Sequence, residues 1–97
     1  MHARVTFATA DPSKVDQSIK IMKDSILPAA KKQKCFKGLT YLINRKTGKG
    51  MVIVLWNTED DMTTGESSGF YQQQVAKVMP LLSAPPTMEH YEVSLKT

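Results

Sequence analysis

The sequence has a single cysteine, Cys35, among its 97 residues. One thiol cannot form an intrachain disulfide, and such cysteine usage is typical of a reducing compartment. No stretch approaches the ~20 apolar residues that a membrane-spanning helix needs, so we expect no membrane partner. The first residues enter a strand pattern at once and lack the features of a signal peptide. Together these absences predict a cytoplasmic protein.

Residues suited to metal or phosphate chemistry are also scarce. The only histidines are His2 and His90, and neither has the spacing to Cys, Asp or Glu that metal ligands show. The sequence contains no phosphate-binding loop, dinucleotide fingerprint or Ser-His-Asp arrangement. We therefore expect neither a metal nor a cofactor.

The formal net charge of +4 is distributed unevenly. Residues 31–49 carry cations and no acid, whereas residues 59–66 carry acids and no cation. A lysine-rich helix end, a solvated hairpin tip and an acidic helix start explain this pattern, with an anionic ligand or complementary subunit patches as alternatives. A nucleic-acid interface needs a basic patch with interleaved aromatics or a known motif, and neither is clear, so no nucleic-acid partner is expected.

The apolar pattern predicts four strands within one domain of residues 1–97. Alternation of apolar side chains marks strands at 3–9, 36–43, 51–56 and 87–95. The two central strands form a hairpin around a turn at Asn44–Gly50. We expect the side chain of Phe36 to lie on the face opposite to Leu39, because their spacing is odd.

Two helical segments separate the strands. Asp11 followed by proline predicts the start of the first helix, and Pro28 kinks it or ends its main segment, with a further turn possible at 29–32. Thr58 with Asp61 is typical of a capping box at the start of the second. Glycines and serines at 65–69 are expected to interrupt that segment before a longer helix.

The resulting order, β-α-β-β-α-β, is that of the α+β ferredoxin-like fold, an antiparallel sheet with its helices on one face. The helices cover only one face, and each face of the hairpin is apolar. The uncovered face carries either the Met51 set, with Ile53 and Leu55, or the Val52 set, with Val54 and Trp56. Such a contiguous apolar patch predicts a homodimer in which two sheets face each other.

Five segments spread over nearly the whole chain carry a family resemblance: Leu27–Ala30, Phe36–Gly38, Thr47–Gly50, Leu55–Glu59 and Glu89–Val93. In order and spacing they resemble the antibiotic biosynthesis monooxygenase (ABM) superfamily. The resemblance implies a single ABM-like domain that forms a dimeric α+β barrel, with a ligand pocket between helices and sheet in each subunit. It also implies activities that range from cofactor-independent oxygenation of polycyclic phenols to haem degradation.

The resemblance also suggests site residues. Trp56 matches a tryptophan that recurs at this strand end in the superfamily. The haem-degrading branch adds an asparagine on the first strand and a histidine on the helix after the tryptophan, and this chain has neither. The quinone-forming branch uses Asn, Trp and Tyr side chains, which this chain offers at Asn57, Trp56 and Tyr71.

Each candidate has two readings from the residues alone. Trp56 is a core residue, a pocket wall on which a flat ligand stacks, or both. Tyr71 is a hydrogen-bond donor to a phenolate or a half-buried helix residue, and Tyr41 is expected in the core or an interface. Arg4 binds a carboxylate or phenolate, or pairs with Glu92 on a neighbouring strand.

The remaining candidates are weaker. His90 is a general base or an ordinary strand residue, and we expect antiparallel pairing to place it near Phe7. Lysines close to Cys35 lower its pKa, or the thiol is a bystander. The glycine segment 65–69 is a lid hinge or a plain turn.

The leading hypothesis is thus a small dimeric ABM-like protein that binds a hydrophobic or aromatic molecule near Trp56 and oxygenates it without metal or flavin. The alternative is a non-catalytic binding or assembly module, with haem degradation third. An empty, polar-edged cavity beside Trp56 favours the first hypothesis, and a packed core favours the second.

Overall fold

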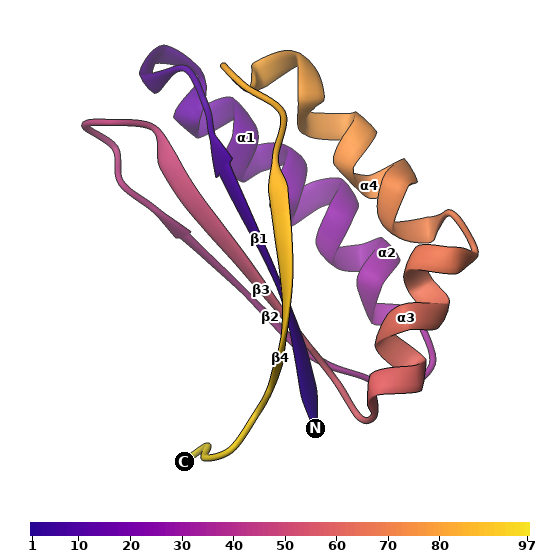
Figure 1. Ribbon diagram of the computed structural model, residues 1–97. Helices are drawn as coiled ribbons and strands as arrows, with labels where there is room; N and C mark the ends of the chain where they lie inside the picture. The colour runs from indigo at the N-terminus through magenta and orange to yellow at the C-terminus, as the bar shows by residue number, and fades with distance from the viewer.

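The computed structural model describes residues 1–97 and has the predicted order of elements (Figure 1). Its strands are β1 (His2–Thr9), β2 (Phe36–Ile43), β3 (Lys49–Trp56) and β4 (Thr87–Glu92). They form one antiparallel sheet in the order β2-β3-β1-β4. The ferredoxin-like prediction is therefore confirmed, although the last strand ends before the expected residue 95.

All the helices lie on one side of this sheet, and no helix lies on its other side (Figure 1). They are α1 (Val15–Ile21), α2 (Leu27–Lys31), α3 (Glu59–Ser67) and α4 (Phe70–Val78). Short helical turns adjoin them at η1 (Pro12–Lys14), η2 (Met22–Ile26) and η3 (Met79–Leu81). Both chain ends lie at the same end of the sheet.

The first helical segment starts where the sequence predicts, and its hydrogen-bond pattern changes shortly before Pro28. The Asp11 side chain accepts a hydrogen bond from the Ser13 amide at 2.9 Å, so it caps η1. Pro28 has no amide hydrogen for a bond to the preceding turn, and the widened π turn η2 lies directly before it. The helix then continues to Lys31, which confirms the further turn after the proline.

The second helical segment breaks within the expected range of residues 65–69, at its end. Thr58 Oγ1 accepts from the Asp61 amide at 3.2 Å and donates to Asp61 Oδ2 at 2.8 Å, which confirms the cap of α3. Gly65 does not interrupt the helix; it is buried within α3. The break is at Gly69, whose φ of +87° separates α3 from α4.

The strand register decides which apolar set faces the helices. Val52, Val54 and Trp56 lie on the helix side, where they line a cavity. The opposite set belongs to a surface that we call the open face, made of Val5, Leu42, Met51, Ile53, Leu55 and Tyr91. Leu42 is 50% exposed and Tyr91 45% exposed on this face.

The expected position of Phe36 was wrong. The register shifts between Phe36 and Gly38, so that Phe36 pairs with Trp56 while Gly38 pairs with Leu55. One extra residue at this bulge turns Phe36 to the helix side, where its ring meets Trp56 edge-to-face with centroids 6.1 Å apart.

Candidate functional site

A cavity of about 90 Å³ lies between the helices and the sheet. Its walls come from β1, β2 and β3 and from the helical segments α1 to α2 and α4, and 14 of its 20 lining residues are hydrophobic. Three predicted site residues, Arg4, Trp56 and Tyr71, are brought together on its wall. Asn57 and His90 are not among the lining residues.

Trp56 is both a core residue and a wall of the cavity. Only 1% of it is exposed, and it packs with Val54 and Met62 in the core. Its indole Nε1 has no hydrogen-bond partner. Buried N–H groups nearly always have a partner, and leaving one unmade costs roughly 1–3 kcal/mol. A residue that lines the cavity thus carries a buried donor without a partner.

Arg4 places a buried cation beside this donor. It is 4% exposed, and its Cζ lies 4.4 Å from the Tyr71 ring centroid and 5.5 Å from the Trp56 ring centroid. Desolvation by burial lowers the pKa of Arg4, and its interaction with Glu66 opposes that shift. Arginine remains charged in proteins even so, and aromatic faces are favourable surroundings for its planar group.

The ion-pair partner predicted for Arg4 was wrong. The register places Glu92 opposite His2, and the partner is Glu66 of α3, whose Oε2 lies 3.3 Å from Arg4 Nη1. Arg4 Nη1 also donates to the Met62 carbonyl at 3.4 Å. Sequence reasoning missed Glu66 because it is 62 positions away from Arg4 and was grouped with the acids at the start of the helix, although it lies near the end of α3.

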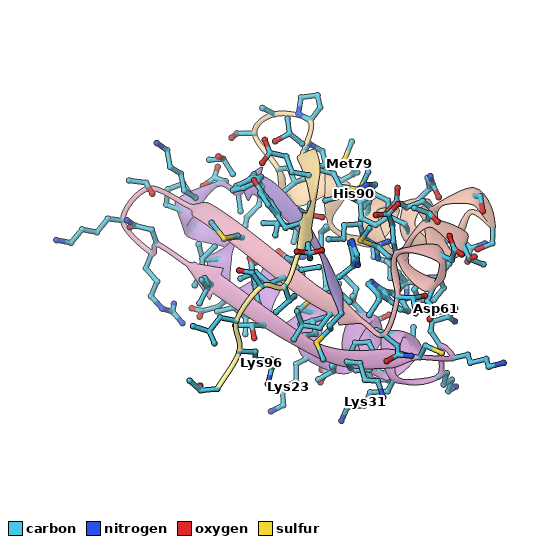
Figure 2. The ribbon with its side chains drawn as sticks, turned by 60° about the horizontal axis from the view of Figure 1, so that its bottom comes forward. Lys23, Lys31, Asp61, Met79, His90 and Lys96 are labelled. Atoms are coloured by element: carbon cyan, nitrogen blue, oxygen red, sulfur yellow. The ribbon has the colours of Figure 1, made fainter.

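His90 lies opposite Arg4 on β4, and the prediction that it neighbours Phe7 was wrong. That prediction extended the strand to residue 95, whereas β4 ends at Glu92 and the pairing is displaced accordingly. The side chain of His90 reaches Glu66, with 2.8 Å between Nε2 and Oε2. Figure 2 shows His90 beside β4, between that strand and the helices.

Hydroxyl pairs complete the polar part of the wall. Thr6 Oγ1 lies 2.9 Å from the Tyr71 hydroxyl, and Ser18 Oγ lies 3.0 Å from the Tyr41 hydroxyl. Tyr41 thus lines the cavity as well as packing in the sheet. Ser18 recurs at helical spacing with the apolar Val15 and Met22, and a polar residue at such a position was the signal that could have identified it.

Two further candidates, Asn57 and Cys35, lie away from the cavity. Asn57 is exposed, and its backbone amide donates to the Cys35 carbonyl at 3.0 Å. Burial, and after it a hydrogen bond with Asp61, raises the pKa of Cys35, so the lysines nearby do not activate the thiol.

No three residues of the His, Cys, Asp and Glu types form a group able to hold a metal ion. Every helix is too short or too polar to cross a membrane.

No family model and no curated protein matches the sequence. Solved structures do match over nearly the whole chain. An antibiotic biosynthesis monooxygenase structure has a TM-score of 0.74 at 10% identity and covers 95% of this chain and 97% of its own. Rv0793 from Mycobacterium tuberculosis has a TM-score of 0.72 at 12% identity, covering 99% and 96%.

A third match holds a ligand. The monooxygenase from the gene ActVA-Orf6 of Streptomyces coelicolor, in complex with nanaomycin D, has a TM-score of 0.70 at 14% identity and covers 93% of this chain and 84% of its own. At such identities the likeness is one of fold. The chain has the ferredoxin-like α+β fold of the antibiotic biosynthesis monooxygenase structures.

Proposed function

We propose that this protein binds a hydrophobic, aromatic small molecule in the cavity beside Trp56 and oxygenates it without a metal or flavin. The observation that carries the proposal is the unpartnered indole N–H of Trp56 on the same apolar wall as the buried Arg4. A mostly apolar cavity with a few convergent polar groups is the usual form of a small-molecule site. A ligand oxygen would satisfy the free donor.

The charge of Arg4 suits a phenol that reacts as its anion. In a site of low dielectric, a fixed cation and hydrogen-bond donors stabilise a phenolate more strongly than water-exposed groups do. Ionisation releases the phenol proton to solvent. The Trp56 N–H and the Tyr71 hydroxyl are the groups on the wall that would orient the phenolate oxygen.

The substrate then supplies its own electrons. The phenolate passes one electron to dioxygen, and the resulting phenoxyl radical and superoxide combine to form a C–O bond at a ring carbon that carries hydrogen. The peroxide takes up a proton, and loss of water across the C–H and O–O bonds leaves a quinone. One oxygen atom of dioxygen enters the product and the other leaves as water, so no external reductant is needed.

The size of the cavity limits what it accepts without rearrangement. A cavity of about 150 Å³ binds benzene, and this one measures about 90 Å³. A ligand of one ring or more therefore requires the wall to widen. The joint between α3 and α4 suits such a motion, because a β-carbon at Gly69 would meet nothing within 4 Å. The fold match that holds nanaomycin D supports an aromatic ligand.

We also propose that the open face is covered by a second copy of the chain. Its half-exposed Leu42 and Tyr91 flank the apolar side chains of β3, and no helix of the chain lies on that side of the sheet. An uncovered apolar patch of this kind typically marks an interface between proteins. The homodimer would leave the cavity of each subunit on the outside, under its own helices.

Oxygen uptake with a panel of phenols and hydroquinones tests the activity, and fluorescence of Trp56, the only tryptophan, tests binding. We expect uptake above the rate without protein, quenching by the same compounds, and loss of turnover in Trp56→Phe, which keeps an aromatic wall but removes the donor. Asn57→Ala is the matched control, because Asn57 neighbours Trp56 but lies outside the cavity. Absence of both uptake and quenching across the panel would refute the proposal.

The small volume of the cavity favours one alternative, a binding module without catalysis. Such a module would show quenching of Trp56 by a tightly bound phenol with no oxygen uptake above background. The two measurements together therefore separate catalysis from sequestration.

A further inference from the structure

A single carboxylate oxygen joins the cavity wall to the protein surface. Glu66 Oε2 lies 3.3 Å from Arg4 Nη1 and 2.8 Å from His90 Nε2. Arg4 is buried, Glu66 has a side-chain exposure of 17%, and His90 one of 39%. One carboxylate oxygen thus links a partly exposed histidine to the cation on the cavity wall.

We propose that Glu66 and His90 set how strongly Arg4 attracts an anionic ligand, with His90 as the proton-sensitive member. When His90 is neutral, it donates to Glu66, and the carboxylate balances the guanidinium. When His90 is protonated, it shares that carboxylate as a second cation, and the group of three has a net positive charge. The cavity then favours an anion over a neutral ligand of the same shape.

The geometry explains why the effect reaches the cavity. Arg4 has only one carboxylate partner, and its other protein hydrogen bond is to a neutral carbonyl. In a buried site, attraction between charges is screened less than at the surface. A change in the charge balance of Glu66 therefore acts on Arg4 across one short, part-buried contact.

Other charged groups nearby do not replace this pair. The ionisable groups around His90 are Glu66 on α3, Arg4 on β1, and Glu89 and Glu92 on its own strand. His2 pairs separately with Glu59, at 3.1 Å and with Glu59 largely exposed, and Tyr71 of α4 faces Arg4 with its ring. His90 is thus the histidine in contact with Glu66, the carboxylate that pairs with Arg4.

The sign of the pH effect follows from histidine titration, which ordinarily falls between about pH 5 and 8. Lowering the pH adds the positive charge and tightens binding of a permanent anion. Lowering the pH also protonates a phenolate and removes the charge of the ligand. This opposes the expected effect, so a phenol is a poor probe. Benzenesulfonate stays anionic throughout, and methyl phenyl sulfone is its neutral counterpart of nearly the same shape.

The inference rests on the proposed binding cavity, and the experiment separates the two. Quenching of Trp56 gives the dissociation constant of each probe at about pH 8 and about pH 5.5. We expect benzenesulfonate to bind roughly five- to tenfold more tightly at the lower pH, within the usual range of coupling between sites. The sulfone should bind equally at both values.

The two histidines provide matched variants. His90→Gln keeps a donor to Glu66 but cannot gain a proton, so it should abolish the pH effect on benzenesulfonate. His2→Gln should leave the effect intact. Equal benzenesulfonate affinity at both pH values in the wild type, or a pH effect that persists in His90→Gln, would overturn the proposal.

A measurement without ligand covers the case in which neither probe binds. The side-chain NMR signals of Arg4 report its surroundings in the free protein. We expect them to shift over the same pH range in the wild type and in His2→Gln but not in His90→Gln. A shift with no probe binding refutes the proposed binding function and leaves the charge coupling standing; no shift refutes the coupling.

Discussion

The guanidinium carbon of Arg4 lies 4.4 Å from the centroid of the Tyr71 ring, although 67 positions separate the two residues along the chain (71 minus 4). Strand β1 supplies the cation, and the first turn of α4 supplies the ring. The same tyrosine bonds through its hydroxyl to Thr6, the next inward residue of β1. One helix thus fixes the position of the cation on the cavity wall.

Replacing Arg4 tests the contribution of the buried charge to folding. We expect Arg4→Met to lower the free energy of unfolding by about 3 kcal/mol, because it leaves the Glu66 carboxylate without its cation. Urea unfolding followed by circular dichroism measures this. Arg45→Met is the control: it breaks the exposed pair with Asp16 and should cost less than about 1 kcal/mol. Equal losses in the two variants would contradict the prediction.

The Tyr71 hydroxyl gives a second comparison. Tyr71→Phe removes the bond to Thr6 and should lower the free energy of unfolding by about 1 kcal/mol. Tyr91→Phe alters a half-exposed tyrosine on the open face and should change the free energy of unfolding by less than about 0.5 kcal/mol. Thermal unfolding of both variants at the same pH distinguishes them. A larger loss in Tyr91→Phe would argue against the assigned role of Tyr71.

Replacement by alanine should change the free energy of unfolding in opposite directions at two glycines, Gly69 and Gly65. At Gly69 the φ of +87° makes a side chain strained, so Gly69→Ala should cost about 1–2 kcal/mol although space is open around it. At Gly65 an added β-carbon would meet Arg4 Nη1 at an ordinary 3.8 Å. Gly65→Ala should therefore stabilise α3 by up to about 1 kcal/mol. Chemical unfolding of each variant gives the sign directly.

The proposed dimer depends on the open face. Ile53→Lys puts a charge in the middle of that face and should weaken association at least ~30-fold, as loss of a central contact does. Met79→Lys is the control, because Met79 is 42% exposed on the helix side (Figure 2). Sedimentation across a dilution series measures both variants. A wild type that is monomeric and folded when concentrated would rule out the dimer.

Cys35 should alkylate slowly for a partly exposed thiol. Burial and then the Asp61 carboxylate raise its pKa, so less thiolate is present at a given pH than in an ordinary cysteine. Iodoacetamide labelling between about pH 7 and 9 should speed up several-fold in Asp61→Asn, because removing the carboxylate lowers the pKa of Cys35. Asp60→Asn removes a charge from the same helical turn and should have a smaller effect.

Local patterns predicted most of the elements because their causes lie within a few residues. Asp11 with the following proline starts a helix, and Thr58 with Asp61 caps another. The alternation of apolar residues predicted the four strands, and with the helical segments it predicted the order of elements along the chain. The errors arose where the pairing register is decided: the bulge between Phe36 and Gly38 turned Phe36 to the other face, and an overlong last strand displaced His90.

The candidate site was predicted only in part for the same reason. Trp56, Tyr71 and Arg4 were expected near a pocket and line one, whereas Asn57 is exposed outside it and His90 is linked to it only through Glu66. Glu66 itself looked like one more acid at a helix start. Nothing in the sequence signals a contact between side chains more than sixty positions apart.

The sequence by itself determined the order of strands and helices, their caps and the apolar excess that a single layer of helices cannot cover, because periodicity and capping act over a few residues. Only the tertiary structure decided that one carboxylate serves both a buried arginine and a surface histidine, and that an indole donor remains free on the cavity wall. Those contacts depend on strand register and helix packing, which fix the distances between residues remote in the chain.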